Sequence, residues 1–207
     1  CDNRENKVKH YNYSKDYIIW SVEKSLRNLN TNYLDLLLLH RPSPLMEAEE
    51  IAEAITILKK EGKIKDFGLS NFTPSHMEMI GLRIDIDVNQ IEFSLTQHSA
   101  MHDGTLDYMA TAGIKPMAWS PLGSVFREDN EQTRRIHKQL SELMDKYNAS
   151  EDQLLLAWIL KHPSGMHPVI GTTNKDRLKL AFEATKINLE LEDWFLILAA
   201  NQGHSVP

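Results

Sequence analysis

Short apolar runs alternate with segments of helical periodicity along most of the sequence. The clearest run, residues 33–39, ends in four consecutive leucines. A run of this length without polar alternation is typical of a strand buried on both faces of a parallel sheet. Further strands are predicted at residues 65–70, 88–91, 114–120 and 167–170. Repeated strand–helix alternation predicts an α/β fold with a parallel sheet, either doubly wound or closed into a barrel.

The segments between these strands have the spacing and end signals of helices. Thr73 followed by Pro74 starts one helix, and Ser150 with Gln153 forms the capping box of another. Helices are predicted to begin at residues 14 and 150 and to span residues 47–61, 74–80, 103–112, 131–147, 174–184 and 190–200.

The glycine pattern favours the barrel over the doubly wound sheet. No predicted strand is followed by the Gly-x-Gly-x-x-Gly sequence of the usual dinucleotide-binding fold. A (β/α)₈ TIM barrel typically has about 250 residues and eight strands. Because the chain has 207 residues and five predicted strands, we expect one barrel domain, residues 1–207, that lacks about three N-terminal βα units.

Composition excludes several kinds of partner. The net charge is −6 and the 23 basic residues are scattered, so no nucleic-acid or anionic-membrane surface is expected. No apolar run is long enough to span a bilayer. Cys1 is the only cysteine, which excludes an internal disulfide and a cysteine-rich metal site and favours a reducing compartment. We therefore expect a soluble, cytoplasmic protein.

Polar, small or aromatic residues follow each predicted strand, where a barrel enzyme carries its chemistry. His40 either caps a strand end in solvent or, as a neutral imidazole, orients a substrate carbonyl. The amides of Asn71 and Gln90 either satisfy loop backbone groups or recognise a carboxamide such as that of nicotinamide. Trp119 is either a core aromatic or a surface on which a flat cofactor ring stacks.

Two further strand ends offer groups that bind anions. Residues 120–124 and the pair Thr172 and Thr173 supply hydroxyls and backbone N–H groups ahead of helices, a usual arrangement for binding phosphates. Arg177, one turn into the last of these helices, is either a surface cation or a partner for a ribose 2′-phosphate.

Four stretches together resemble the aldo-keto reductases. They are YLDLLLLHRP at residues 33–42, GKIKDFGLSNF at 62–72, Asn89 with Gln90, and MAWSPLG at 117–123. The resemblance extends over residues 14–201 and is greatest to bacterial oxidoreductases of that superfamily. It implies a TIM barrel that binds NADPH or NADP and reduces a small-molecule carbonyl substrate.

The resemblance also implies a role for each strand-end residue. His40 corresponds to the catalytic histidine of the family, and Trp119 to the aromatic residue that stacks on nicotinamide. The ligands of the nicotinamide carboxamide would be Ser70, Asn71 and Gln90. The diphosphate would lie at Ser120, Pro121, Leu122, Gly123 and Ser124, and the adenosine 2′-phosphate at Gly171, Thr172, Thr173 and Arg177. No metal ligand is implied.

One departure from the family pattern bears on catalysis. The proton-donating tyrosine, the aspartate and the lysine of the family fall upstream of Cys1. Tyr11, Tyr13 and Lys15 are not substitutes, because they follow the strand that would carry the lysine. We therefore expect the natural protein to be longer and the 207-residue chain alone to have no reductase activity.

A second departure bears on the cofactor. Gly171 stands where a lysine is common, and Leu180 with Ala181 replaces a polar pair that often contacts adenine. Arg177 still favours NADPH, while NADH remains an alternative.

The predicted function is NADPH-dependent reduction of aldehydes or ketones to alcohols by hydride transfer. The alternative is an NADPH-binding sensor on the same scaffold without turnover. A metal-dependent hydrolase is disfavoured, because the strand ends carry amides and hydroxyls rather than clustered histidine and aspartate. Zinc at His98 and His102 is disfavoured because no third ligand is spaced nearby. The short tail after residue 201 favours an open site and small substrates, and the pattern predicts no oligomeric state.

Overall fold

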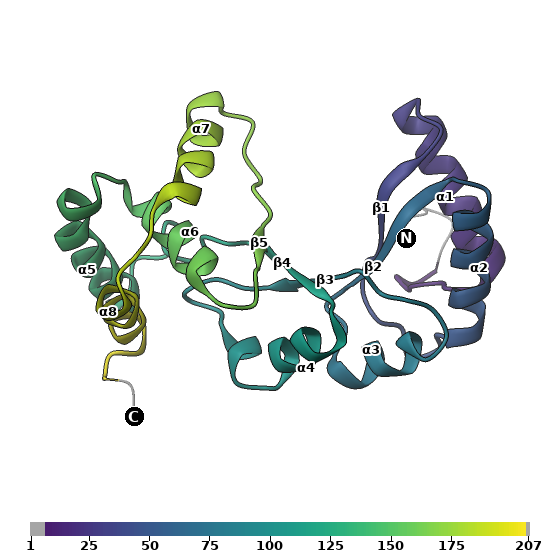
Figure 1. Cartoon of the computed structure of the whole chain (residues 1–207), viewed down its shortest axis with the longest axis horizontal. Coiled ribbons are helices and arrows are strands. Elements are labelled where there is room, and N and C mark those ends of the chain that lie inside the picture. Colours follow the sequence, from purple (N-terminus) through teal and green to yellow (C-terminus); the bar gives the residue numbers. More distant parts are fainter. Residues whose placement is uncertain (1–6, 206–207) are drawn as a thin grey trace. The chain divides into compact units, whose positions relative to one another are not determined.

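The fold is α/β, with strands and helices alternating along the chain (Figure 1). The computed structural model describes residues 7–205, so Cys1 and the expectations that rest on it lie outside the described residues. The strands are β1 (Leu34–Leu39), β2 (Ile64–Ser70), β3 (Val88–Glu92), β4 (Lys115–Trp119) and β5 (His167–Pro168). Their order in the sheet is β1-β2-β3-β4-β5, which is their order in the sequence. The pairs β1–β2, β2–β3 and β4–β5 are parallel, as predicted.

Every helix predicted from periodicity and caps is present, with ends within two residues of those expected. The helices are α1 (Lys15–Leu29), α2 (Ala48–Lys60), α3 (Pro74–Gly81), α4 (Thr105–Ala112), α5 (Glu131–Tyr147), α6 (Glu151–Lys161), α7 (Lys175–Glu183) and α8 (Leu191–Gln202). Two short 3₁₀ turns, Ser99–Met101 and Ala184–Lys186, were not predicted. Within residues 7–205, no helix combines the length and the apolar character needed to cross a membrane.

The predicted caps form at the helix ends. Thr73 accepts the backbone N–H of His76 through its side chain at 3.4 Å, and the Gln153 side chain accepts the backbone N–H of Ser150 at 3.0 Å. These bonds satisfy donors that a helix leaves unpaired in its first turn.

The chain divides into two compact units. One comprises Cys1–Gln90 with Asp107–Lys115, and the other comprises Ile91–Leu106 with Pro116–Pro207. The expectation that residues 1–207 form one barrel domain stays a prediction.

The core of the first unit lies against β2. Ile51, Ile55 and Leu58 on one face of α2 are fully buried, as their spacing predicted. Gly68 in β2 lies so close to β3 that an added Cβ would be 2.6 Å from the carbonyl oxygen of Val88. A side chain at this position would therefore separate the two strands.

Two strands differ from expectation. Residues 33–39 were predicted to be buried on both faces, but only Leu39 of β1 is buried. The reason is that β1 lies at an edge of the sheet, where one side has no neighbouring strand in the described chain. The strand expected at residues 167–170 is shorter, because regular pairing ends at Pro168. One further bond, from the N–H of Val169 to the carbonyl of Ala118, extends the contact.

The core of the second unit is centred on Trp158, which is fully buried in α6. Its ring stacks on that of Trp194 in α8, with centroids 4.9 Å apart and planes within 7°. The indole N–H of each tryptophan donates to the backbone carbonyl of the other, at 3.2 and 2.9 Å. This reciprocal pair holds α6 against α8 and satisfies both indole donors.

Candidate active site

Three predicted residues come together at the carboxyl ends of β2 and β3. Ser70, the last residue of β2, pairs with Gln90 of β3. Asn71 follows in the left-handed conformation, with φ 62°, and its backbone N–H donates to the carbonyl of Gln90 at 2.8 Å. Its side-chain Nδ2 donates to Ser70 Oγ at 3.0 Å. The register and this turn therefore place one hydroxyl and two amides at a single edge of the sheet.

Asn89, which also belongs to the motif in β3, supports this edge from the inside. Its side chain is fully buried. Nδ2 donates to the carbonyl of Phe72 at 3.0 Å, and Oδ1 accepts the N–H of Phe72 at 3.5 Å. Asn89 therefore anchors the loop that follows Ser70 and Asn71 rather than facing a ligand.

His40 follows the last residue of β1 and is exposed. The ring of Tyr11 meets it edge-on, with centroids 5.8 Å apart. Both residues line a cavity of about 170 Å³ that Tyr13 also borders. The Tyr13 hydroxyl donates to the carbonyl of Arg41 and accepts its N–H, and burial raises the pKa of this hydroxyl. Tyr13 is thus bonded to the backbone beside His40.

In the second unit, the loop after β4 is held tightly. We call residues 120–130 the post-β4 loop. Gly123 has φ 56°, and an added Cβ would lie 2.1 Å from Thr96 Oγ1 and 2.6 Å from Ser94 Oγ. Thr96 Oγ1 also accepts the backbone N–H of Ser124 at 3.0 Å. Only a glycine fits here, because Ser94 and Thr96 occupy the space beside it, and the Thr96 hydroxyl holds the next residue of the turn.

Three residues in contact with this loop were not identified from the sequence: Ser94, Thr96 and Arg127. Arg127 donates to the carbonyl of Gly123 through Nε at 3.1 Å and through Nη2 at 2.6 Å. Nη2 also lies 3.4 Å from Ser120 Oγ. In the sequence, Arg127 is only a cation a few residues after a predicted phosphate-binding segment. No sequence pattern marked Ser94 or Thr96 as part of the site.

The predicted residues before α7 form a second polar turn. Asn174 caps the helix, since its Oδ1 accepts the N–H groups of Asp176 and Arg177 at 2.9 and 3.2 Å. Thr172 Oγ1 accepts the N–H of Asn174 at 3.2 Å. Arg177 therefore lies in the first turn of α7 with an exposed side chain. Gly171 has open space around its Cα, since an added Cβ meets nothing within 4 Å.

His98 and His102, weighed as zinc ligands, have other contacts. The ring of His98 lies 5.6 Å from that of His102, and its Nδ1 is 2.9 Å from the carbonyl oxygen of Leu95. Burial lowers the pKa of His98, which favours the neutral ring. Within residues 7–205, no group of three or more histidine, cysteine, aspartate or glutamate side chains could hold a metal ion.

Comparison with known proteins shows the family. The sequence matches the aldo/keto reductase family over residues 4–202, and the chain belongs to that family. It is 41% identical over 203 residues to an uncharacterized oxidoreductase, YcsN, of Bacillus subtilis, covering 96% of this chain and 68% of the relative. It is 40% identical to the oxidoreductase YdhF of Escherichia coli, covering 98% of this chain and 69% of YdhF.

A third relative and a solved structure extend the comparison. A 6-dehydroglucose reductase of Agrobacterium fabrum is 35% identical, covering 97% of this chain and 68% of the relative. The crystal structure of the thermostable aldo-keto reductase Tm1743 with the inhibitor epalrestat superimposes with a TM-score of 0.82 at 26% identity, covering 91% of this chain and 67% of that one. The predicted family and its TIM-barrel fold are therefore confirmed, and the chain belongs to a family of enzymes that reduce carbonyl compounds.

Proposed function

We propose that the intact protein reduces small aldehydes or ketones with NADPH as the hydride donor. The observation that carries this proposal is the set of one hydroxyl and two amides at Ser70, Asn71 and Gln90. Amide groups both donate and accept hydrogen bonds, which is what recognition of the nicotinamide carboxamide requires.

The chain's own residues fit such a cofactor. The post-β4 loop carries hydroxyls at Ser120 and Ser124. Gly123, where a Cβ would collide with Thr96, allows the backbone to turn closely there. Small residues and hydroxyls in a loop ahead of a helix are common surroundings of a bound diphosphate.

Each residue then has a distinct task. In the first unit, Ser70, Asn71 and Gln90 would hold the carboxamide. In the second unit, Trp119 would offer a flat surface for the nicotinamide ring. Residues 120–124 hold the diphosphate. When bound, the nicotinamide supplies the hydride that is transferred to a carbonyl carbon. His40 donates a hydrogen bond to the carbonyl oxygen and orients it.

The preference for NADPH over NADH rests on the turn before α7. Thr172, Thr173 and the exposed guanidinium of Arg177 lie on one short segment, at a helix N-terminus. A guanidinium binds a phosphate through paired N–H groups, so Arg177 would hold the 2′-phosphate that distinguishes NADPH. Gly171 would leave room for it.

The proposal that the substrate is a small carbonyl compound rests on a relative. The relative at 35% identity is named a 6-dehydroglucose reductase, and its name gives an oxidised sugar as the compound that is reduced. The same chemistry in this protein would use a sugar-sized aldehyde or ketone.

The test is steady-state turnover by the full-length protein. A panel of aldehydes, ketones and dicarbonyls is supplied with NADPH or NADH, and consumption of the reduced cofactor is followed. We expect turnover with NADPH and a loss of roughly a hundred-fold in kcat/KM in His40→Ala, because the carbonyl loses its orienting group.

His167→Ala, at an exposed histidine in β5, is the control and should retain wild-type turnover. Tight NADPH binding without turnover of any carbonyl would instead identify the sensor that the sequence left open.

A further inference from the structure

His137 connects the post-β4 loop to the rest of the second unit. It lies in α5, and both of its ring nitrogens contact acceptors. Nε2 is 3.0 Å from the carbonyl oxygen of Val125, and Nδ1 is 2.8 Å from Oε2 of Glu151. A carbonyl oxygen only accepts, so Nε2 carries a proton and donates it.

The contact with Glu151 holds the ring in this orientation. With Nε2 protonated, the Nδ1–carboxylate contact requires one more proton, on Nδ1 or on the carboxyl oxygen. Either way the two residues share a proton and form a hydrogen bond. Glu151 is the first residue of α6, in which residues 153–159 are buried, so the helix that carries this carboxylate is fixed by the core.

Val125 transmits this constraint to the predicted phosphate-binding residues. Its side chain is buried, and it directly follows Ser124. Its N–H donates to the carbonyl of Leu122 at 3.4 Å. Holding the Val125 carbonyl therefore also limits how the turn at residues 120–124 can open.

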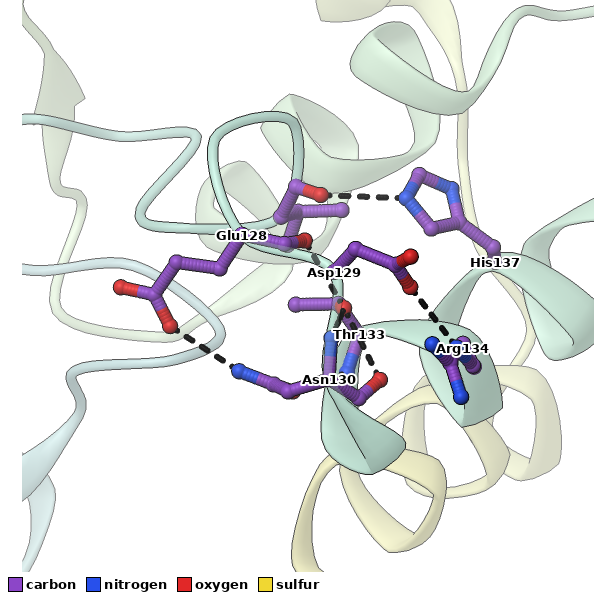
Figure 2. A network of polar contacts seen from close by, with 7 residues as sticks. Glu128, Asp129, Asn130, Thr133, Arg134 and His137 are labelled. Carbon is purple, nitrogen blue, oxygen red and sulfur yellow. Dashed lines mark hydrogen bonds and ion pairs between the residues drawn. The ribbon is translucent and has the colours of Figure 1, made fainter.

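The start of α5 is secured without His137, as Figure 2 shows. Asn130 accepts the N–H of Thr133 at 3.0 Å, and Thr133 Oγ1 donates to the carbonyls of Glu128 and Asn130. Arg134 pairs with Asp129 at 2.7 Å. The helix is thus capped by other residues, which leaves the His137 bond to Val125 as a contact that constrains the loop.

We propose that His137, held by Glu151, is a positioning residue for the cofactor: it keeps the post-β4 loop in the shape that binds the diphosphate. This inference rests on the proposed function, because it assigns the diphosphate to residues 120–124. His137 acts on the loop backbone and takes no part in hydride transfer. It therefore controls cofactor affinity and leaves the chemical step unchanged.

The test uses four variants of the full-length protein: His137→Ala, Glu151→Ala, Glu151→Gln and the matched control His204→Ala, at an exposed histidine. Glu151→Gln keeps the contact, because a glutamine amide donates to an unprotonated Nδ1. Three quantities are measured for each variant. They are the dissociation constant of NADPH without substrate, the hydrogen exchange of amides 122–127 without cofactor, and kcat at saturating NADPH.

We expect His137→Ala and Glu151→Ala to raise the NADPH dissociation constant roughly three- to ten-fold, the equivalent of one hydrogen bond. Both should speed exchange at residues 122–127 and leave kcat within about two-fold. Glu151→Gln and His204→Ala should match the wild type in all three readouts.

The outcomes separate this inference from the proposed function. Unchanged NADPH affinity in both alanine variants of a protein that binds NADPH overturns the role of His137 alone. Failure of the wild type to bind NADPH overturns both the proposed function and the role of His137 in cofactor binding. Hydrogen exchange at residues 122–127 then still reports whether His137 holds the loop. If His137→Ala does not fold, the contrast between Glu151→Ala and Glu151→Gln decides, and equal affinities in these two overturn the inference.

Discussion

The backbone N–H of Asn71 donates to the carbonyl of Gln90 at 2.8 Å, which fixes the turn after one strand to the end of the next. Because this bond uses main-chain atoms only, the side chain of Gln90 can be changed without removing either of the bonded atoms. The amide of Gln90 can therefore be tested for ligand binding separately from the fold.

Replacing Gln90 with leucine should weaken cofactor binding and leave the fold intact. We expect Gln90→Leu to raise the dissociation constant of NADPH about ten-fold, because the carboxamide loses a hydrogen-bond partner in a desolvated site. Fluorescence titration measures this, and circular dichroism checks the fold. Gln139→Leu, in the middle of α5, is the control and should bind like the wild type. Equal affinity in Gln90→Leu would remove this residue from the site.

Arg127 should increase the affinity for the cofactor, because its guanidinium holds the carbonyl of Gly123 in the post-β4 loop. Arg127→Lys keeps the charge but loses the two-nitrogen contact with the Gly123 carbonyl, while Arg127→Gln loses both. We expect the NADPH dissociation constant to rise roughly three-fold in the first and ten-fold in the second, with a weaker salt dependence in the glutamine variant.

Arg134→Gln, in the first turn of α5, is the control for the loss of one positive charge, since Arg134 pairs with Asp129 at the surface. An Arg127→Gln protein that binds NADPH like Arg134→Gln would rule out a role for Arg127 at the diphosphate.

Gly68→Ala should destabilise the protein, because an added Cβ would lie 2.6 Å from both the Val88 carbonyl oxygen and Leu38 Cδ2. The first is a backbone atom that cannot move without separating β2 from β3. We expect a loss of about 1–3 kcal/mol in the free energy of unfolding, measured with urea.

Gly81→Ala should not destabilise the protein and serves as the control. Gly81 is the last residue of α3, and an added Cβ would meet only Ile86 Cδ1, at an ordinary 3.8 Å. Alanine favours the helix over glycine by up to about 1 kcal/mol, so this variant should be equally or more stable. A Gly68→Ala protein as stable as Gly81→Ala would contradict the close packing of β2 on β3.

Asp193 should make stability depend on acid pH. Lys146 Nζ lies 2.7 Å from its carboxylate, and the Tyr147 hydroxyl donates to the same oxygen. Burial alone would raise the pKa of Asp193, but these two hydrogen bonds lower it below the ordinary 3.8. A carboxyl group whose pKa is lower in the folded protein than in the unfolded chain stabilises the fold at pH values above its unfolded pKa. That contribution is lost as the pH falls through the folded value.

Urea unfolding of Asp193→Asn and wild type at a series of pH values checks this. We expect the wild type to be more stable at neutral pH and the difference to shrink below pH 3.8, where Asp193 becomes protonated. Asp145→Asn, at an exposed residue in the last turn of α5, is the control and should lack this pH dependence. A difference that stays constant into acid would show that the pKa of Asp193 is not lowered in the folded protein.

The order and type of the elements could be predicted because they depend on local patterns. Hydrophobic spacing located α1 and α2, and the capping signals at Thr73 and Ser150 located two helix starts. The incomplete burial of the β1 leucines could not be predicted in this way. It depends on which strand pairs with which, and the same apolar run suits an edge strand or a central one.

The candidate site, too, could be predicted only in part. The sequence alone determined which residue types follow each strand, and so it identified Ser70, Asn71, Gln90 and the segment 120–124. Only the tertiary structure decided that Thr96 packs against Gly123 and that His137 donates to Val125. A hydrogen bond requires two atoms within about 3 Å, and that separation depends on the path of the chain between them. Periodicity reports which face a residue occupies, whereas the packed fold decides which distant residue lies opposite it.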